Sequence, residues 1–401
     1  MKVIIVGAGF GGLAVAKILS KYQGISTTLI DRHPYQLFSP LLYQVATGGL
    51  PEDDIAYPVR AAISNLNFIK SEVKKVDHDK NQIQLSDNRI LEYDQLVLAT
   101  GSTGTTFNIP GVAEHALQMK TIQEARAIKH KLLNTYEEVA ENRKPKESLK
   151  VVVIGGGPTG VEVAGAIAEL QKSLKKEFPE IASFADVSLV EAGPRLLPMF
   201  KEKSSKKAKK DLEILGVKVY LDSMVDRMYE SDVHLKNGKV LSAGTFIWAA
   251  GVAAYSQWNQ LGEVDRSNRL KVNEYLQLKE NVWVIGDGAN FEVDEKPLPM
   301  VAPVAMQMGR HVAKQILNLR NQKPLKKFSY TDKGQMATIG RRRAVVEMPS
   351  GIRFSGTFAW LTWLALHVAY LAGGRNRISV VADWMWNYLA WGIGPRRTVI
   401  D

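Results

Sequence analysis

The sequence predicts an α/β fold because two short apolar segments, about 150 residues apart, each run into a glycine-rich loop and then into a helical pattern. The segments span residues 2–6 and 151–154, and their loops contain Gly7, Gly9 and Gly12, and Gly155, Gly157 and Gly160. In this G-x-G-x-x-G pattern the first glycine allows a tight turn, the second lets the backbone approach a pyrophosphate, and the third lets the helix pack on the strand. The helix N-terminus offers free N–H groups to the phosphates. The pattern therefore predicts two Rossmann-like dinucleotide-binding domains.

A second strand pattern follows each loop and ends in an acidic residue, Asp31 after the first loop and Glu191 after the second. A carboxylate in this position accepts hydrogen bonds from ribose hydroxyls and repels a 2′-phosphate. We therefore expect one dinucleotide at each loop, electron transfer between the two, and a preference for NADH over NADPH at the second loop. Arg195 is the one nearby basic group that could weaken this preference. The alternative is two ordinary strand–turn–helix units whose glycines only make turns.

Three later apolar segments indicate how the chain is divided. Residues 96–101 end in Ala-Thr-Gly, residues 246–251 end in Ala-Ala-Gly at a similar distance from the second loop, and residues 282–288 contain Gly-Asp. The simplest arrangement inserts the second dinucleotide-binding domain into the first. We therefore expect a first domain formed by residues 1–112 and 276–330, a second domain of residues 113–275, and a C-terminal segment of residues 331–401.

The composition excludes several kinds of redox site. The chain has no cysteine, so a redox-active cysteine pair, an iron–sulfur cluster or a thiolate zinc site cannot be built. Its seven histidines lack the spacing of metal ligands, so we expect no bound metal and infer that electrons leave through an organic cofactor. The formal net charge is +11, but no recognised binding motif accompanies it, so we expect no nucleic-acid partner.

The C-terminal segment is rich in apolar and aromatic residues. Residues 358–372 are nearly all apolar, but this run is shorter than the roughly 20 residues needed to span a bilayer. Residues 378–393 combine a polar stripe at helical spacing with an aromatic one, namely Ser379, Asp383 and Asn387 against Trp384, Tyr388 and Trp391. Five of the eight tryptophans lie in this segment: Trp360, Trp363, Trp384, Trp386 and Trp391.

Aromatic residues with flanking arginines are typical of helices that lie in the membrane interface, so we expect a membrane-associating helical segment. The alternative is a dimer interface or a cover on the protein's own core, and a homodimer stays open. The first strand begins at Lys2, which leaves no space for a secretory signal. We therefore expect a peripheral protein at the cytoplasmic face of the cell membrane.

Taken together, these motifs resemble those of the type II NADH dehydrogenases, which are single-subunit, non-proton-pumping NADH:quinone oxidoreductases of the two-dinucleotide-binding-domain flavoprotein superfamily. The resemblance covers nearly the whole chain and is carried by LYQVATG at 42–48, GPTGVE at 157–162, EAGPRLLP at 191–198, Gly-Asp at 286–287 and APVAMQ at 302–307. It implies FAD at the first loop and NADH at the second.

The resemblance also assigns site residues. Asp31 and Arg32 would lie at the adenosine end of FAD, Val73 would offer its backbone to adenine, and Asp287 would meet the ribityl chain. A helix that begins near Pro303 would direct its N-terminus at the flavin. The cofactor-binding candidates are Gly7, Gly9, Gly12, Asp31, Arg32, Val73, Thr100, Gly101, Asp287, Ala302, Pro303, Gly155, Gly157, Gly160, Glu191 and Gly251.

Glu162 and Gln307 are the catalytic candidates. Glu162 follows the third glycine of the second loop, where an acid can simply favour the positive end of a helix dipole. The resemblance instead places it near the flavin, and a carboxyl group with a raised pKa suits the protonation of a quinone. Gln307 could donate to a quinone carbonyl, although a helical glutamine is often only solvated. The family also has glutamine at the position of Pro303, which leaves the quinone head group open.

We therefore expect an FAD-dependent oxidoreductase that transfers electrons from NADH to a membrane quinone without pumping protons. Two alternatives remain: a soluble NADH-dependent reductase of rubredoxin or ferredoxin, and a membrane-bound redox sensor that is not an enzyme. The aromatic C-terminal segment favours the quinone enzyme over the soluble reductase.

Overall fold

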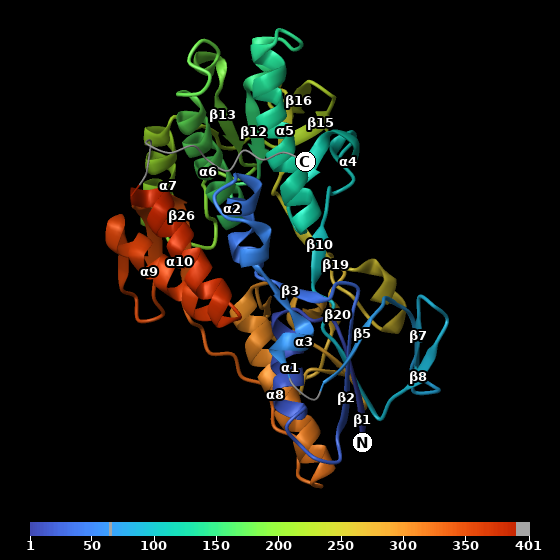
Figure 1. Ribbon diagram of the computed structural model, residues 1–401. Helices are drawn as coiled ribbons and strands as arrows, with labels where there is room; N and C mark the ends of the chain where they lie inside the picture. The colour runs from blue at the N-terminus through green and yellow to red at the C-terminus, as the bar shows by residue number, and fades with distance from the viewer. Residues whose placement is uncertain (64–65, 390–401) are drawn as a thin grey trace. The chain divides into compact units, whose positions relative to one another are not determined.

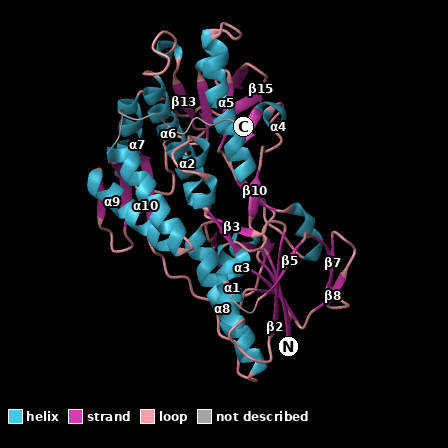
Figure 2. Ribbon diagram, viewed as in Figure 1, coloured by secondary structure: helices cyan, strands magenta, loops and turns pink. Residues whose placement is uncertain are grey.

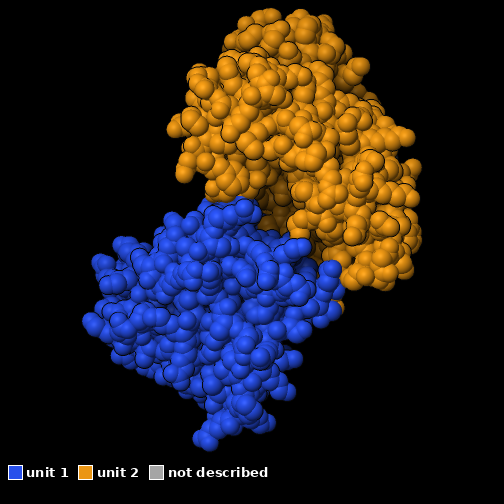
Figure 3. All heavy atoms as spheres, turned by 180° about the vertical axis from the view of Figure 1, so that it is seen from behind, with its two compact units in different colours: residues 1–37, 56–103, 252–332 blue, residues 38–55, 104–251, 333–401 orange. Residues whose placement is uncertain are grey.

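Two mainly parallel β-sheets organise the residues that the structure, a computed structural model, describes: 1–63 and 66–389 (Figures 1 and 2). Each sheet belongs to its own compact unit. Unit 1 contains residues 1–37, 56–103 and 252–332, and unit 2 contains residues 38–55, residues 104–251 and the chain from residue 333 onward (Figure 3). The predicted α/β class with two Rossmann-like domains is confirmed.

The sheet of unit 1 has six strands in the order β21-β22-β9-β1-β2-β5. They are β1 (Lys2–Val6), β2 (Ser26–Asp31), β5 (Asn67–Lys70), β9 (Gln95–Leu98), β21 (Gln277–Lys279) and β22 (Val282–Val284). β1 pairs in parallel with β2 and β9, and β22 pairs in parallel with β9, whereas β21 is antiparallel. The carboxyl ends of β1, β9 and β22 therefore lie at one edge of the sheet, where α/β folds bind ligands.

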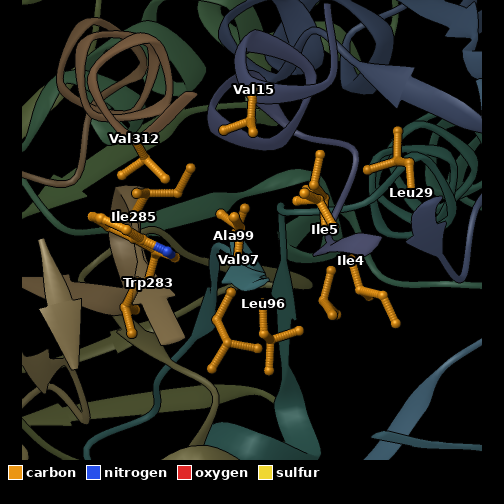
Figure 4. Packing of buried hydrophobic residues seen from close by; sticks show 14 of the residues in the cluster. Ile4, Ile5, Val15, Leu29, Leu96, Val97, Ala99, Trp283, Ile285 and Val312 are labelled. Atoms are coloured by element: carbon orange, nitrogen blue, oxygen red, sulfur yellow. The ribbon is translucent and has the colours of Figure 1, made fainter. Parts of the chain in front are cut away.

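The core of unit 1 lies between this sheet and two helices, α1 (Phe10–Leu19) and α8 (Ala302–Arg320). Figure 4 shows Val15 of α1 and Val312 of α8 directed toward the strands, where Ile5 and Val97 are buried. Both faces of a parallel sheet are covered, so its strands read as unbroken apolar runs rather than as alternating patterns. This is why residues 2–6 could be identified as a buried strand.

Smaller elements complete unit 1. They include the short helix α3 (Val59–Ala62), the turn η6 (Gly286–Gly288) and an antiparallel sheet of β6 (Val73–Asp77), β7 (Gln82–Leu85) and β8 (Ile90–Glu92). The two-stranded pairs are β3 (Tyr35–Leu37) with β4 (Ala56–Pro58), β20 (Leu270–Lys271) with β23 (Ala289–Asn290), and β24 (Glu292–Val293) with β25 (Lys296–Pro297). β10 (Ser102–Gly104) also pairs with β19 (Val252–Ala254).

The sheet of unit 2 has five strands in the order β11-β18-β12-β13-β14, and every neighbouring pair is parallel. They are β11 (Ala116–Gln118), β12 (Val151–Ile154), β13 (Val187–Val190), β14 (Lys218–Tyr220) and β18 (Thr245–Trp248). The helices of this part are α4 (Val112–His115), α5 (Ile122–Ala140), α6 (Pro158–Leu174) and α7 (Glu202–Leu215). An antiparallel sheet of β15 (Val225–Met228), β16 (Asp232–Leu235) and β17 (Val240–Ser242) adjoins them.

Two segments that are distant in sequence also belong to unit 2. One contains the short helix α2 (Leu42–Ala46), and the other begins at residue 333. The second segment forms an antiparallel sheet and two helices: β26 (Gln335–Gly340), β27 (Arg343–Glu347), β28 (Arg353–Ser355), α9 (Thr357–Tyr370) and α10 (Gly374–Leu389). β26 packs closely on α6, because a Cβ atom on Gly165 would lie only 1.8 Å from the Ile339 carbonyl oxygen.

The chain passes between the two units after residues 37, 55, 103, 251 and 332. These crossings separate two compact units and do not test a division into functional domains. The predicted four-part division, with boundaries after residues 112, 275 and 330, stays a prediction.

Candidate functional site

The first glycine loop has the geometry of a phosphate-binding turn. Gly7 has a φ of +105°, and a Cβ atom there would lie 2.2 Å from the Ala99 carbonyl oxygen, so only glycine fits. A Cβ atom on Gly12 would lie 1.8 Å from the Gly7 carbonyl oxygen, which is the close helix–strand contact that the third glycine permits. A Cβ atom on Gly9 would meet nothing within 4 Å. Space for a pyrophosphate therefore lies over the middle glycine.

The second loop repeats this arrangement in unit 2. Gly155 has a φ of +114°, and its Cβ atom would lie 2.6 Å from the Ala249 carbonyl oxygen. A Cβ atom on Gly160 would lie 1.8 Å from the Gly155 carbonyl oxygen, while one on Gly157 would meet nothing within 4 Å. Both loops thus fit a dinucleotide, and the two patterns are more than turns of ordinary strand–turn–helix units.

Asp31 and Glu191, the two acids predicted to bind ribose, make the same pair of hydrogen bonds to the backbone. Asp31 accepts hydrogen bonds from Ala8 N–H and from the N–H two residues beyond itself, both at 2.7 Å. Glu191 accepts from Gly156 N–H at 2.5 Å and from the N–H two residues beyond itself at 2.7 Å. Sequence reasoning predicted ribose binding but missed this role in holding the loops. Each carboxylate oxygen keeps a second lone pair for a ribose hydroxyl, so the two roles are compatible.

Several other candidates of unit 1 lie at the carboxyl edge of its sheet. Thr100 and Gly101 follow β9, and Gly101 has a φ of +71° with nothing near its would-be Cβ atom. Asp287 lies in the turn η6 after β22, where it accepts a hydrogen bond from Ser102 Oγ at 2.5 Å. Since β1, β9 and β22 are neighbours, their ends bring the glycine loop, Thr100 and Asp287 to one edge.

The helix predicted to begin near Pro303 is α8, and it begins one residue earlier at Ala302, with Pro303 in its first turn. It packs closely on α1, because a Cβ atom on Gly309 would lie 2.4 Å from the Gly11 carbonyl oxygen. This contact places the N-terminal part of α8 beside the helix that follows the first loop.

Three further candidates of unit 1 already have partners within the protein. Arg32 donates to the Tyr255 hydroxyl at 2.6 Å, and the Val73 carbonyl accepts from the Gln257 side chain at 3.3 Å. Gln307 on α8 both donates to the Thr331 carbonyl at 2.9 Å and accepts from the Thr331 N–H at 3.0 Å. Gln307 is therefore held rigidly, with one amide proton left for another acceptor. Its role toward a quinone stays a prediction.

In unit 2, Gly251 follows β18, and its carbonyl accepts from the Thr105 N–H at 3.2 Å. A Cβ atom on Gly251 would lie 2.4 Å from the ring of Phe107. Glycine at this position lets the segment around Thr105 and Phe107 pack against the end of β18. Its predicted contact with a nucleotide stays a prediction.

Glu162 is the fifth residue of α6, beyond the first turn, in which no acid is found. The favourable interaction with a helix dipole falls off within that turn, so this alternative explains the residue poorly. The carboxylate accepts from the Thr338 N–H at 3.4 Å and from the Trp363 side chain. Burial raises the pKa of Glu162 to about 8, and these two hydrogen bonds lower it only in part. A carboxyl group of this kind holds a proton near neutral pH.

Glu162 lines a cavity of about 70 Å³ that lies wholly within unit 2. Water can touch part of its side chain there, although protein atoms surround it. The walls come from α6, α2, the end of β26, α9 and α10, and the other lining residues are Tyr43, Gln44, Thr47, Gly49, Ala166, Glu169, Thr338, Gly340, Arg341, Trp360, Trp384 and Asn387. Sequence reasoning missed most of these residues as members of one site because they come from five separate segments. Ala166 and Glu169, four and seven residues after Glu162 on the same helix face, could have been found from spacing.

The C-terminal helices form part of this site. Trp384 on α10 is only 5% exposed and donates its indole N–H to the Gln44 side chain at 2.7 Å. Trp360 and Trp363 on α9 are buried as well, so these three tryptophans cover the protein's own core and cavity. Trp386, in contrast, is 67% exposed. Of the predicted aromatic stripe, Trp384 faces inward, while Trp391 and the side chain of Tyr388 lie outside the described residues.

Both helices also expose large apolar side chains, which we together call the outer apolar face. Its residues are Phe358, Leu361, Leu366 and Tyr370 on α9 and Ile378, Val381, Met385 and Trp386 on α10. Within residues 1–63 and 66–389, no helix is both long enough and apolar enough to cross a membrane.

Comparison with known proteins agrees with this geometry. Residues 1–309 match the pyridine nucleotide-disulphide oxidoreductase family, and residues 333–390 match the NDH2 C-terminal domain. Type II NADH:quinone oxidoreductase Ndh of Mycobacterium tuberculosis is 35% identical over 97% of this chain and 88% of its own length. The type II NADH:quinone oxidoreductase of Staphylococcus aureus is 31% identical over 86% of this chain and 89% of its own.

Solved structures agree in fold. NDH2 from Plasmodium falciparum, solved in complex with NADH, is 24% identical, covers 99% of both chains and has a TM-score of 0.90. The sulfide:quinone oxidoreductase of Aquifex aeolicus is 20% identical over 98% of this chain and 96% of its own, with a TM-score of 0.72. The duplicated loops, the whole-length match and the C-terminal domain together establish that the chain belongs to the type II NADH:quinone oxidoreductase family.

Proposed function

We propose that this protein is an FAD-dependent enzyme that transfers two electrons from NADH to a membrane quinone without pumping protons. The observation that carries this function is the exact repetition of one loop geometry: two tight glycine turns, each with open space over its middle glycine. Two such loops hold two dinucleotides, one as the resident cofactor and one as the substrate. The absence of cysteine leaves the organic cofactor as the electron carrier.

The residues of unit 1 fit FAD. The open space over Gly9 receives the pyrophosphate at the N-terminus of α1, and Asp31 accepts from the adenosine ribose. Arg32 and Val73 lie at the adenosine end, and Asp287 accepts from the ribityl hydroxyls. The free N–H groups of α8, which begins at Ala302 and Pro303, stabilise negative charge on the cofactor. When bound, FAD supplies the two-electron chemistry that connects NADH with the quinone.

The second loop selects NADH as the electron donor. Gly157 admits the pyrophosphate, and Glu191 accepts from the adenosine ribose and repels a 2′-phosphate. Arg195 donates to the Pro198 carbonyl at 2.6 Å, which ties its guanidinium to its own loop. The one group that could favour NADPH is thus engaged elsewhere, and this supports a preference for NADH.

Glu162 gives a proton to the quinone. Its pKa of about 8 keeps the carboxyl group protonated near neutral pH, and the cavity beside it admits small polar molecules. Gln307 directs its remaining amide proton to a quinone carbonyl. Glu162 belongs to unit 2 and Gln307 to unit 1.

The outer apolar face binds the cytoplasmic surface of the membrane. Eight large apolar side chains are exposed along α9 and α10, and Arg375 and Arg377 are exposed near the start of α10. Helices with this pattern lie in the interface, with their apolar face among the acyl chains and their basic residues near anionic headgroups. A second copy of the chain is the other partner that would cover such a face, so the test must separate a lipid surface from a homodimer.

The function is tested by steady-state oxidation of NADH by the FAD-loaded protein. We expect turnover with a short-chain quinone, little turnover with NADPH, and none with oxidised ferredoxin or rubredoxin. Turnover with ferredoxin but not with quinone would establish the soluble reductase instead. Binding of FAD and NADH without turnover on any acceptor would establish a redox sensor. Flotation with anionic liposomes, compared with the mass of the protein in detergent, separates lipid binding from dimer formation.

A further inference from the structure

A second carboxylate faces the same cavity as Glu162. Glu169 lies seven residues further along α6, and Ala166 lies between them on the same side of the helix. Two helical turns separate the two acids by about 10 Å along the axis. A water molecule takes up about 30 Å³ in the liquid, so the cavity of about 70 Å³ has space for about two water molecules. A short chain of water can therefore connect the two carboxylates.

Glu169 is held in place by the turn after β26. One of its oxygens accepts from the Arg341 N–H at 2.6 Å. A Cβ atom on Gly340 would lie 2.9 Å from that same oxygen, so glycine at this position makes room for the carboxylate. These contacts fix one oxygen of Glu169 at the cavity wall.

Arg341 balances one of the two carboxylate charges that face the cavity. Its titratable and charged side chains among the described residues are Glu162 and Glu169 from α6, Tyr43 from α2 and Arg341 from the turn after β26. With both carboxylates ionised, these groups have a net charge of minus one, and with one proton on either acid they are neutral. A partly buried site is more stable when its charges are balanced.

The proposed reaction needs that single proton. The balanced equation is NADH + H⁺ + quinone → NAD⁺ + quinol, in which NADH provides two electrons and one proton as a hydride. The second proton of the quinol must therefore come from water once in each turnover.

We propose that Glu169 resupplies Glu162 with this proton through the cavity that both carboxylates line. Glu162 gives its proton to a quinone oxygen and becomes a carboxylate. Glu169 then passes a proton through the intervening water to Glu162 and takes one from solvent. Glu169 does not contact the quinone itself and acts only through Glu162, so it is a positioning residue rather than a catalytic one. This inference rests on the proposed NADH:quinone activity.

The test compares Glu169→Gln with the FAD-loaded wild type in two stopped-flow experiments, reduction by NADH and reoxidation by a short-chain quinone. Glutamine keeps an oxygen that accepts from the Arg341 N–H, so the structural contact survives while the acid is lost. We expect reduction by NADH to change less than about twofold, and reoxidation to slow at least about tenfold above neutral pH. Acetate, a small soluble acid, should restore reoxidation in proportion to its concentration. Glu177→Gln, just beyond α6 and exposed, is the matched control and should behave as the wild type.

Reoxidation of Glu169→Gln at the wild-type rate across about pH 6 to pH 9 would overturn the proposal. Equal slowing at every pH without rescue by acetate would also overturn it, because that pattern indicates a structural role. Ala166→Val provides a second test that leaves both acids in place but fills the cavity. It should slow reoxidation in the same way, and an unchanged rate would show that the cavity carries no proton.

Failure of the proposed function is distinguishable from failure of this inference. A wild-type protein without quinone turnover refutes the function alone. In that case the infrared band of the protonated carboxyl group decides: the relay requires its pH titration to differ between wild type and Glu169→Gln, and identical titrations would overturn it.

Discussion

Replacing Glu162 with glutamine should stabilise the folded protein, and the gain should increase with pH. Burial raises the pKa of Glu162 from its ordinary 4.5 to about 8 in the folded state. Between these two values the folded chain retains a proton that the unfolded chain has released, so the free energy of unfolding falls as the pH rises. Below the ordinary pKa there is no such penalty, and above about pH 8 the penalty is complete.

The magnitude follows from the same pKa. At about 1.36 kcal/mol for each pKa unit, the full penalty is about 5 kcal/mol. Water reaches part of the side chain in the cavity and reduces this figure, so we expect a measured gain of about 2–4 kcal/mol at high pH. Glutamine keeps an oxygen for the Thr338 N–H, so the loss of the charge is the main change.

The assay is urea unfolding of the FAD-loaded wild type, Glu162→Gln and the control Glu177→Gln, at about pH 5 and about pH 9. The difference between variant and wild type at one pH removes the contribution of all other titrating groups. His367, which stacks on Trp363 near Glu162, has a pKa lowered by burial to about 4 and stays neutral at both values. A gain that is the same at both pH values, or that is larger at pH 5, would refute the argument that Glu162 is forced to ionise in a buried site.

Three further predictions follow from the loops and the outer apolar face. Glu191→Gln should raise the Michaelis constant for NADH and bring it closer to the Michaelis constant for NADPH, while FAD stays bound. Unchanged Michaelis constants for both nucleotides would contradict the assignment of Glu191 to the ribose. Gly157→Ala should leave the melting temperature unchanged but weaken NADH binding, because its Cβ atom meets only the space for the pyrophosphate. Gly160→Ala should lower the melting temperature by several degrees, because its Cβ atom meets a carbonyl oxygen. Equal melting temperatures for the two variants would contradict the roles given to the two glycines. Replacing both Met385 and Trp386 with serine should reduce flotation with liposomes at least about tenfold without loss of activity toward a water-soluble quinone, and undiminished flotation would exclude this face as the membrane surface.

The loops could be predicted from sequence because their chemistry is local. Gly7 and Gly12 contact each other across five residues, and the same is true of Gly155 and Gly160. The strand, the turn and the helix that produce this contact are consecutive, so spacing alone identifies them. Position in a parallel sheet then explains why Thr100 and Asp287 reach the same edge.

The cavity could not be predicted because no local pattern encodes it. Gln44, Glu162, Arg341 and Trp384 come from four segments that meet only in the folded unit. The number of tryptophans marked the C-terminal segment as unusual, but it did not indicate which tryptophan side chains face the protein core and which face outward. Trp384 and Trp386 differ by two positions, or about 200° around a helix, so one is buried while the other is exposed.

This opposition gives α10 two roles that cannot be separated by truncation. Its inner face holds the segment around α2 through three side chains: Asn376 donates to the Asp53 carbonyl at 2.9 Å, Trp384 to Gln44 at 2.7 Å and Asn387 to the Gly49 carbonyl at 2.8 Å. Its outer face carries exposed apolar residues. Removing the chain after residue 355 would therefore open the cavity beside Glu162 at the same time as it removes the outer apolar face. Loss of activity after such a truncation would not show that the quinone enters from lipid, because a wall of the cavity would be missing too. Substitutions confined to the outer apolar face alter membrane binding while the inner contacts stay in place. They therefore test whether quinone reduction depends on membrane binding.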